Sequence, residues 1–129
     1  NWVYSERAWQ NEHSGQWVKG KSSDTFAPLG PCMVTTDELT DTGDLSLWSK
    51  VNGESRQNGR SSDMIFSVPF LVSYISRFMT LLPGDVIATG TPGGVGMGYN
   101  PPQYLSAGDQ VEQGIEGIGS MCQCVSMDD

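Results

Sequence analysis

Two tracts rich in glycine and proline limit the length of any regular element in this chain. The first runs from Gly20 to Pro31 and the second from Leu82 to Gly96. With 16 glycines and 7 prolines among 129 residues, the sequence is turn-rich, a composition that favours many short strands over long helices. We therefore expect one domain over residues 1–129 with an α+β, mainly β fold.

Alternation of apolar and polar residues predicts a half-buried strand in the middle of the chain. Leu45, Leu47 and Val51 occupy odd positions between more polar neighbours. Asn52-Gly53 follows, and this dipeptide is the strongest short signal for a hairpin because both residues tolerate positive φ. The return strand is predicted from Glu54 to Gln57, ended by a turn at Asn58-Gly59.

The second half of the chain contains the only predicted main helix. Apolar residues recur at helical spacing from Phe70 to Leu82, with Ser67 as N-cap and Pro83-Gly84 as the stop. A short buried strand is predicted for residues 85–89 and a glycine-rich loop for 90–98. A final hairpin is predicted to turn near Glu116-Gly117 and to run to Val125, with Gly114 weakening its first strand.

Composition excludes several classes of partner. Seven basic against fifteen acidic residues give a net charge of −8 without a basic stripe, which argues against binding to nucleic acid or anionic membrane. The longest apolar stretch is too short to span a bilayer. No leader is evident and the first residue is not Met, so we expect a fragment of an intracellular protein. Three cysteines predict free thiols, with a two-thiol metal clip at Cys122 and Cys124 as the alternative.

Three motifs carry a resemblance to a known family. They are Ser5-Glu6-Arg7-Ala8-Trp9-Gln10, Gly20-Lys21-x-x-Asp24-Thr25-Phe26-x-Pro28-Leu29-Gly30-Pro31, and Thr89-Gly90-Thr91-Pro92-Gly93-Gly94 preceded by Pro83-Gly84-Asp85-Val86-Ile87. Together they resemble the catalytic C-terminal part of the fumarylacetoacetate hydrolase superfamily over residues 1–125. The segment 101–109 is most similar to the subgroup called fumarylacetoacetate hydrolase domain-containing protein 2.

The resemblance implies a fold and an activity. The fold is a truncated mixed β-sandwich roll with one main helix. The activity is hydrolysis, decarboxylation or tautomerisation of small anionic 2-oxo or 1,3-dioxo acids, of acylpyruvate or oxaloacetate type, with Mg or Mn. The resemblance also implies a homodimer, in either mitochondria or cytoplasm.

The same resemblance assigns roles to six residues. Lys21 and Arg7 would be catalytic through their charge, because a metal and an ammonium group stabilise an enolate oxygen. Gln10, Thr91 and Pro92 would contact the substrate, and Thr25 would support the outer shell of the metal. Without the motif context, Lys21 fits a solvated lysine, Arg7 an exposed arginine beside Trp9, and residues 90–94 a plain turn. We predict that Lys21, Thr25, Arg7 and Thr91 converge on one concave patch.

The metal ligands of the family are not found in this sequence. Its two glutamates belong to a segment upstream of these motifs, and its aspartate falls on Val3, or on Trp2 with a one-residue shift. Neither side chain binds a hard cation. Glu6 is a substitute that would require a local shift, His13 is read as a surface residue, and the acidic residues 37–44 as a solvated turn. Two functions stay open: an enzyme of the family, or a non-catalytic remnant that keeps the scaffold and a subunit interface.

Overall fold

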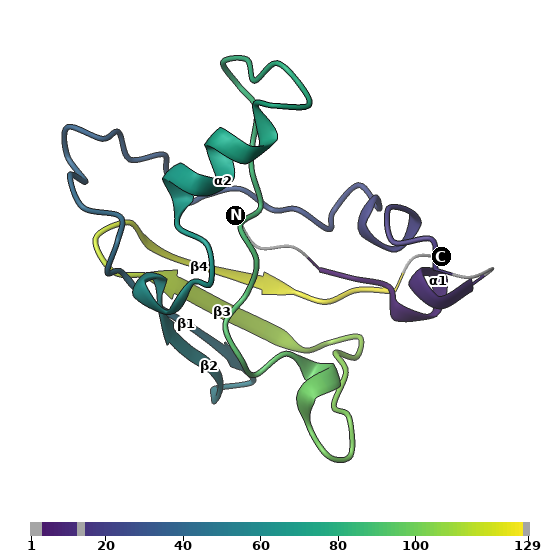
Figure 1. Ribbon diagram of the computed structural model, residues 1–129. Coiled ribbons are helices and arrows are strands. Elements are labelled where there is room, and N and C mark those ends of the chain that lie inside the picture. Colours follow the sequence, from purple (N-terminus) through teal and green to yellow (C-terminus); the bar gives the residue numbers. More distant parts are fainter. Residues whose placement is uncertain (1–3, 13–14, 128–129) are drawn as a thin grey trace. The chain divides into compact units, whose positions relative to one another are not determined.

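The computed structural model describes residues 4–12 and 15–127 (Figure 1). The chain divides into two compact units. Unit 1 contains the described residues up to Gly30 together with Val86–Ala88, and unit 2 contains Pro31–Asp85 and the described residues from Thr89 onward. The prediction of one domain over residues 1–129 stays a prediction, and each unit is therefore described by itself.

Unit 2 is built on a four-stranded antiparallel sheet. Its strands are β1 (Ser46–Val51), β2 (Glu54–Arg60), β3 (Gln110–Ile115) and β4 (Gly119–Cys124), in the spatial order β2-β1-β3-β4 (Figure 1). Asn52 and Gly53 turn the first hairpin with φ of 52° and 82°, as expected. The second hairpin also turns at Glu116-Gly117, as expected. The four-stranded sheet, together with few and short helices, confirms the predicted α+β, mainly β fold class.

The return strand of the first hairpin is longer than expected. β2 continues to Arg60, and Gly59 pairs with Leu47 rather than forming a turn with Asn58. The predicted turn at Asn58-Gly59 is therefore wrong. Pairing with β1 offers the backbone a complete ladder there, and this overrides the local turn preference of the dipeptide.

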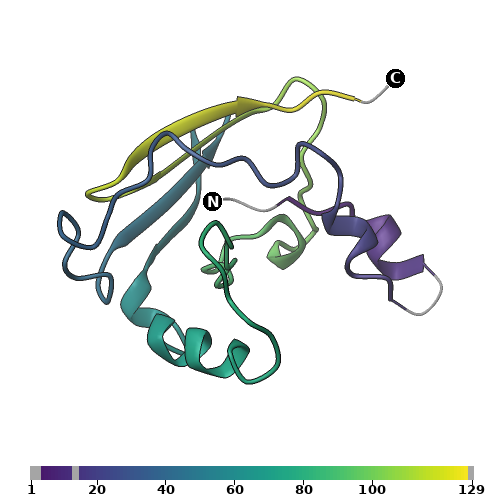
Figure 2. The same ribbon diagram turned by 90° about the horizontal axis from the view of Figure 1, so that it is seen from above.

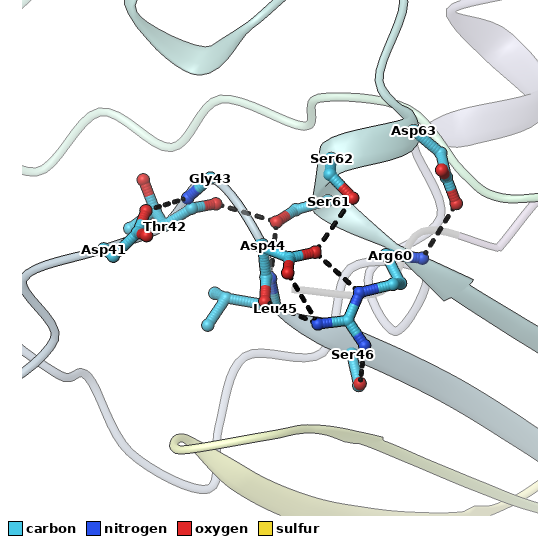
Figure 3. A network of polar contacts seen from close by, with 10 residues as sticks. All are labelled: Asp41, Thr42, Gly43, Asp44, Leu45, Ser46, Arg60, Ser61, Ser62 and Asp63. Atoms are coloured by element: carbon cyan, nitrogen blue, oxygen red, sulfur yellow. Dashed lines mark hydrogen bonds and ion pairs between the residues drawn. The ribbon is translucent and has the colours of Figure 1, made fainter.

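A polar network closes the open end of this hairpin (Figure 3). The Arg60 guanidinium donates from Nε to Asp44 Oδ1 at 2.6 Å and from Nη2 to Asp44 Oδ2 at 2.8 Å. Ser62 in the 3-10 helix η3 (Ser61–Asp63) donates to the same carboxylate at 2.9 Å. These donors, Arg60 first, lower the pKa of Asp44 to about 2. The segment before β1 is thereby fixed to the turn after β2.

The main helix, α2 (Val68–Ile75), begins as predicted and ends early. Ser67 Oγ accepts the amide N–H of Phe70 at 3.4 Å, and Pro69 lies in the first turn. The predicted continuation to Leu82 is wrong. Ser76 Oγ donates to Val72 O at 2.7 Å, and Arg77 N donates to Tyr74 O at 3.2 Å, so the chain tightens and leaves the α-helical path.

The apolar face of α2 is exposed. Phe66, Phe70, Tyr74 and Phe78 form a row of ring contacts with centroid separations of 4.9, 6.2 and 5.1 Å. These side chains retain roughly half or more of their exposure, and Figure 2 shows α2 standing away from the sheet. Residues 85–89 form no strand, contrary to prediction, since their three consecutive apolar residues, 86–88, are a weak signal without a pairing partner.

The interior of unit 2 is mostly polar. Within the described residues, Val111 is the only buried hydrophobic side chain. Ser49 pairs with Gln57 on one side and with Gln113 on the other, so these three buried residues form a row across β2, β1 and β3. Directly opposed residues share one face of a sheet. One face of the sheet therefore presents hydrogen-bonding groups at its centre.

The neighbouring row explains Gly114. Trp48 pairs with Gly114, and a Cβ on this glycine would lie 2.6–2.8 Å from three atoms of the indole ring. The sequence interpretation treated Gly114 as a weakness in β3. The structure shows instead that its missing side chain provides the space occupied by Trp48.

Candidate functional site

Unit 1 holds four of the six residues predicted for the site. Arg7 and Gln10 lie on a short helix, α1 (Arg7–Asn11). Lys21 ends a 3-10 turn, η2 (Lys19–Lys21), and Thr25 lies in the loop after it. The α1 helix was not predicted, because five residues are too few to show helical periodicity. Glu6 N donates to Gly20 O at 2.9 Å and Tyr4 N donates to Phe26 O at 2.9 Å, which holds the two motifs together.

Arg7 and Gln10 lie one turn apart on α1 and contact each other. Arg7 Nη1 donates to Gln10 Oε1 at 2.6 Å, and the guanidinium carbon lies 5.3 Å from the centroid of the Trp17 ring. Gln10 is 1% exposed, and its Nε2 is buried without a hydrogen-bond partner. Arg7 is half-buried against Trp17 and Gln10, so the alternative of an exposed arginine beside Trp9 is wrong.

The positive charges of Lys21 and Arg7 lie close enough to repel each other. Partial burial, followed by repulsion from Arg7, lowers the pKa of Lys21 below its usual value. Among the described residues, neither Lys21 nor Arg7 forms an ion pair. Thr25 is exposed in the same unit, four residues beyond Lys21. Two cations without a carboxylate partner favour an anion beside them.

Two neighbouring residues have structural roles that the sequence did not reveal. Glu6 is the N-cap of α1, and its carboxylate accepts the amide N–H of Ala8 at 2.8 Å. It is thus already engaged in capping. A Cβ on Gly20 would lie 2.5 Å from Glu6 O and would also clash with the Gln10 side chain. The close approach permitted by Gly20 is therefore to α1.

Thr91 and Pro92 lie in unit 2, in a loop that contacts strand β2. Gln57 Nε2 donates to Thr91 Oγ1 at 2.7 Å and to Pro92 O at 3.1 Å. A Cβ on Gly59 would lie 2.7 Å from Pro92 Cβ, and one on Gly94 would clash with the Arg56 carbonyl. Glycines thus let the loop and the strand approach at two points, and the prediction of a loop over residues 90–98 is confirmed, with a 3-10 turn η4 (Gly96–Gly98) at its end.

The convergence of Lys21, Thr25 and Arg7 with Thr91 stays a prediction, because the first three belong to unit 1 and Thr91 to unit 2. Val3 and His13 lie outside the described residues.

The donor set of the described residues does not fit a metal. No group of three His, Cys, Asp or Glu side chains in residues 4–12 and 15–127 could hold an ion. Glu6 is engaged in capping, and Thr25 offers one neutral oxygen. A divalent ion needs several oxygen ligands, usually including carboxylates. Its ligands would have to come from outside this set. Cys32, Cys122 and Cys124 are exposed and unbridged.

The chain belongs to the family described as fumarylacetoacetate hydrolase C-terminal, whose profile matches residues 3–126. A presumed hydrolase of Burkholderia multivorans is 56% identical over 120 residues, which cover 92% of this chain and 43% of that protein. The chain therefore spans less than half the length of such relatives. Within the described residues, no helix is long and apolar enough to cross a membrane.

Solved structures share the fold. A fumarylacetoacetate hydrolase from the psychrophile Exiguobacterium antarcticum is 45% identical with a TM-score of 0.91, covering 96% of this chain and 44% of its own. Maleylpyruvate hydrolase from Sphingobium sp. SYK-6, in complex with manganese(II) and pyruvate, is 38% identical with a TM-score of 0.76, covering 84% of this chain and 39% of its own. The neighbours include hydrolases and isomerases of small acids, such as 2-hydroxyhepta-2,4-diene-1,7-dioate isomerase from Mycobacterium marinum, 46% identical with a TM-score of 0.81 over 95% of this chain and 44% of its own.

Sequence reasoning missed Gln57, which contacts both predicted loop residues. Thr91 follows it by 34 positions, so no local motif joins the two. A signal was nevertheless present. Ser49 occupies the odd position between Leu47 and Val51, which the alternation assigns to the buried side. A polar residue at a buried strand position requires a hydrogen-bond partner, and Gln57 provides it.

Proposed function

We propose that this chain supplies part of a catalytic domain that hydrolyses, decarboxylates or tautomerises small 2-oxo or 1,3-dioxo acids. The observation that carries the proposal is the cluster in unit 1. Arg7 and Lys21 lack ion-pair partners among the described residues, and Gln10 holds a buried, unpartnered Nε2 beside Arg7. Family membership supports the same reading, since its hydrolases and isomerases act on small acids.

The cluster suits an anionic ligand with a second oxygen. The Arg7 fork matches a carboxylate, and the Lys21 ammonium offsets charge that develops on an enolate oxygen. Gln10 Nε2 would donate to a carbonyl oxygen of the substrate, and Thr91 to its carboxylate. We propose Mg or Mn as the cofactor, because a neighbour was crystallised with manganese.

The second candidate is a non-catalytic remnant that keeps the scaffold and a subunit interface. Val3 at the expected aspartate position favours it. With either function we propose a homodimer, a similarity to the subgroup called fumarylacetoacetate hydrolase domain-containing protein 2, and a mitochondrial or cytoplasmic location.

Two measurements on the 129-residue chain test the proposal. NMR detects the binding of pyruvate, and an activity assay at millimolar manganese measures the turnover of acylpyruvate and oxaloacetate. We expect Lys21→Met to weaken pyruvate binding about tenfold, or about 1.4 kcal/mol. Lys19→Met is the matched control, because Lys19 lies in the same 3-10 turn, is 52% exposed and pairs with Glu12 at 2.6 Å. Wild-type protein that binds no pyruvate and turns over neither acid would leave the remnant as the better account.

A further inference from the structure

The side chain of Gln57 has one permitted orientation. Its amide lies between Ser49 Oγ on one side and Thr91 Oγ1 with Pro92 O on the other. A carbonyl oxygen only accepts hydrogen bonds, so the atom that faces Pro92 O must be the amide nitrogen. The amide oxygen then faces Ser49, whose hydroxyl donates to it at 3.0 Å. Ser49 is 5% exposed and Gln57 9%, so water does not compete readily for either group.

This orientation also settles what the Thr91 hydroxyl does. Gln57 donates one amide hydrogen to Thr91 Oγ1 at 2.7 Å and the other to Pro92 O at 3.1 Å. The oxygen of Thr91 therefore accepts from inside the protein, and its own hydrogen must point elsewhere. The available partner is Pro92 O at 3.2 Å, which is long for an O–H donor. Thr91 is exposed, so this hydrogen can turn to a ligand at small cost.

We propose that Gln57 is a positioning residue that makes Thr91 a hydrogen-bond donor to the carboxylate of a small acid. The inference rests on the proposed function for its ligand. The inference goes beyond the proposed function in two ways. It names a buried residue, Gln57, that does not touch the ligand, and it fixes the direction of the hydrogen bond that Thr91 makes. The row Ser49–Gln57–Thr91 passes from the centre of the sheet to the surface loop, with each hydroxyl or amide donating outward.

Gln57→Glu tests the direction, since the two side chains have nearly the same shape. An ionised carboxylate at this position only accepts, so Thr91 would donate inward and lose its hydrogen for a ligand. At about pH 8 we expect pyruvate to bind tenfold or more weakly than to wild type. Near about pH 5 the buried carboxyl, its pKa raised by desolvation, becomes a neutral donor, and affinity should recover. None of the three partners of Gln57 titrates, so the recovery would belong to the new carboxyl.

Two further variants complete the design. Gln57→Met removes the donor without adding charge and should weaken binding at both pH values. Gln110→Glu is the matched control, because Gln110 is exposed on β3 and bonds to Asn52 through its backbone alone: its N–H donates to Asn52 Oδ1, and its carbonyl accepts the amide N–H of Asn52. Its pyruvate affinity should stay within about twofold of wild type.

A ligand-free readout separates this inference from the proposed function. The ¹³Cβ shift and χ1 coupling of Thr91 should change in Gln57→Glu and Gln57→Met and stay constant in Gln110→Glu. If wild type fails to bind pyruvate but Thr91 responds, the proposed function is wrong and Gln57 still orients Thr91. If Thr91 is indifferent to both Gln57 variants, or the pyruvate affinity of Gln57→Glu does not recover at low pH, the positioning role is refuted.

Discussion

Replacing Gly114 with alanine should destabilise unit 2 through Trp48 alone. The added Cβ would lie 2.6 Å from Cζ2, 2.7 Å from Cε2 and 2.8 Å from Nε1 of the indole. Real Cβ atoms essentially never approach other atoms so closely, and all three contacts belong to one rigid ring. The ring must therefore move as a whole or the two strands must separate.

The expected magnitude follows from two opposing effects. Overpacking costs about 1–3 kcal/mol, whereas replacing glycine by alanine within a strand otherwise gains about 0.5–1 kcal/mol. The net loss should be about 1 kcal/mol. Urea denaturation monitored by circular dichroism measures this loss of stability. We expect the variant to unfold at a lower midpoint concentration of urea with an unchanged m-value.

A double-mutant cycle isolates the cause. In a Trp48→Val background the clash is absent, so Gly114→Ala should be neutral or stabilising by up to about 1 kcal/mol. The coupling free energy between the two positions should then be about 1 kcal/mol or more. Equal destabilisation in both backgrounds would refute the reasoning, because the cost would then lie in the backbone of β3.

Three further changes test other contacts. Ser67→Ala removes the N-cap of α2 and should cost about 1 kcal/mol in urea denaturation, whereas Ser67→Asp should cost little. Gly20→Ala should destabilise unit 1 by about 1–3 kcal/mol and disturb the Arg7–Gln10 contact, which the NMR shift of the Gln10 side-chain amide reports; an unchanged shift would contradict the packing. Asp44→Asn should lower stability at neutral pH and become harmless in acid. The folded pKa of Asp44 lies below its unfolded value, so its contribution is present above about pH 4 and is lost as the pH falls towards about 2. A stability difference between Asp44→Asn and wild type that stays constant down to about pH 2 would contradict this assignment.

Local signals predicted the elements that depend on a few adjacent residues. Asn52-Gly53, the Glu116-Gly117 turn and the Ser67 cap act within four residues, and all three are confirmed. Elements that depend on partners far along the chain were predicted poorly. Asn58 and Gly59 pair with β1 as part of β2 instead of forming a turn, and residues 85–89 do not form a strand.

The site shows the same division. The motifs indicated Arg7, Gln10 and Lys21, which all lie in unit 1. Arg7 is hydrogen-bonded to Gln10, and partial burial together with the charge of Arg7 lowers the pKa of Lys21. The role of Gly20 depends on the position of α1, a helix that the sequence did not predict. The Gln57–Thr91 contact crosses from a strand to a loop, and such pairings are set by the tertiary fold rather than by spacing.

The polar interior has a thermal consequence. Unfolding raises the heat capacity through newly hydrated apolar surface and lowers it through newly hydrated amides and hydroxyls. Within the described residues, four of the five buried side chains are polar, three glutamines and one serine, and the aromatic row along α2 is hydrated before unfolding begins. The heat-capacity increment should therefore fall below the usual value of about 12–15 cal/mol/K per residue. A small increment flattens the dependence of stability on temperature, so this chain should lose little stability between a cold and a warm environment.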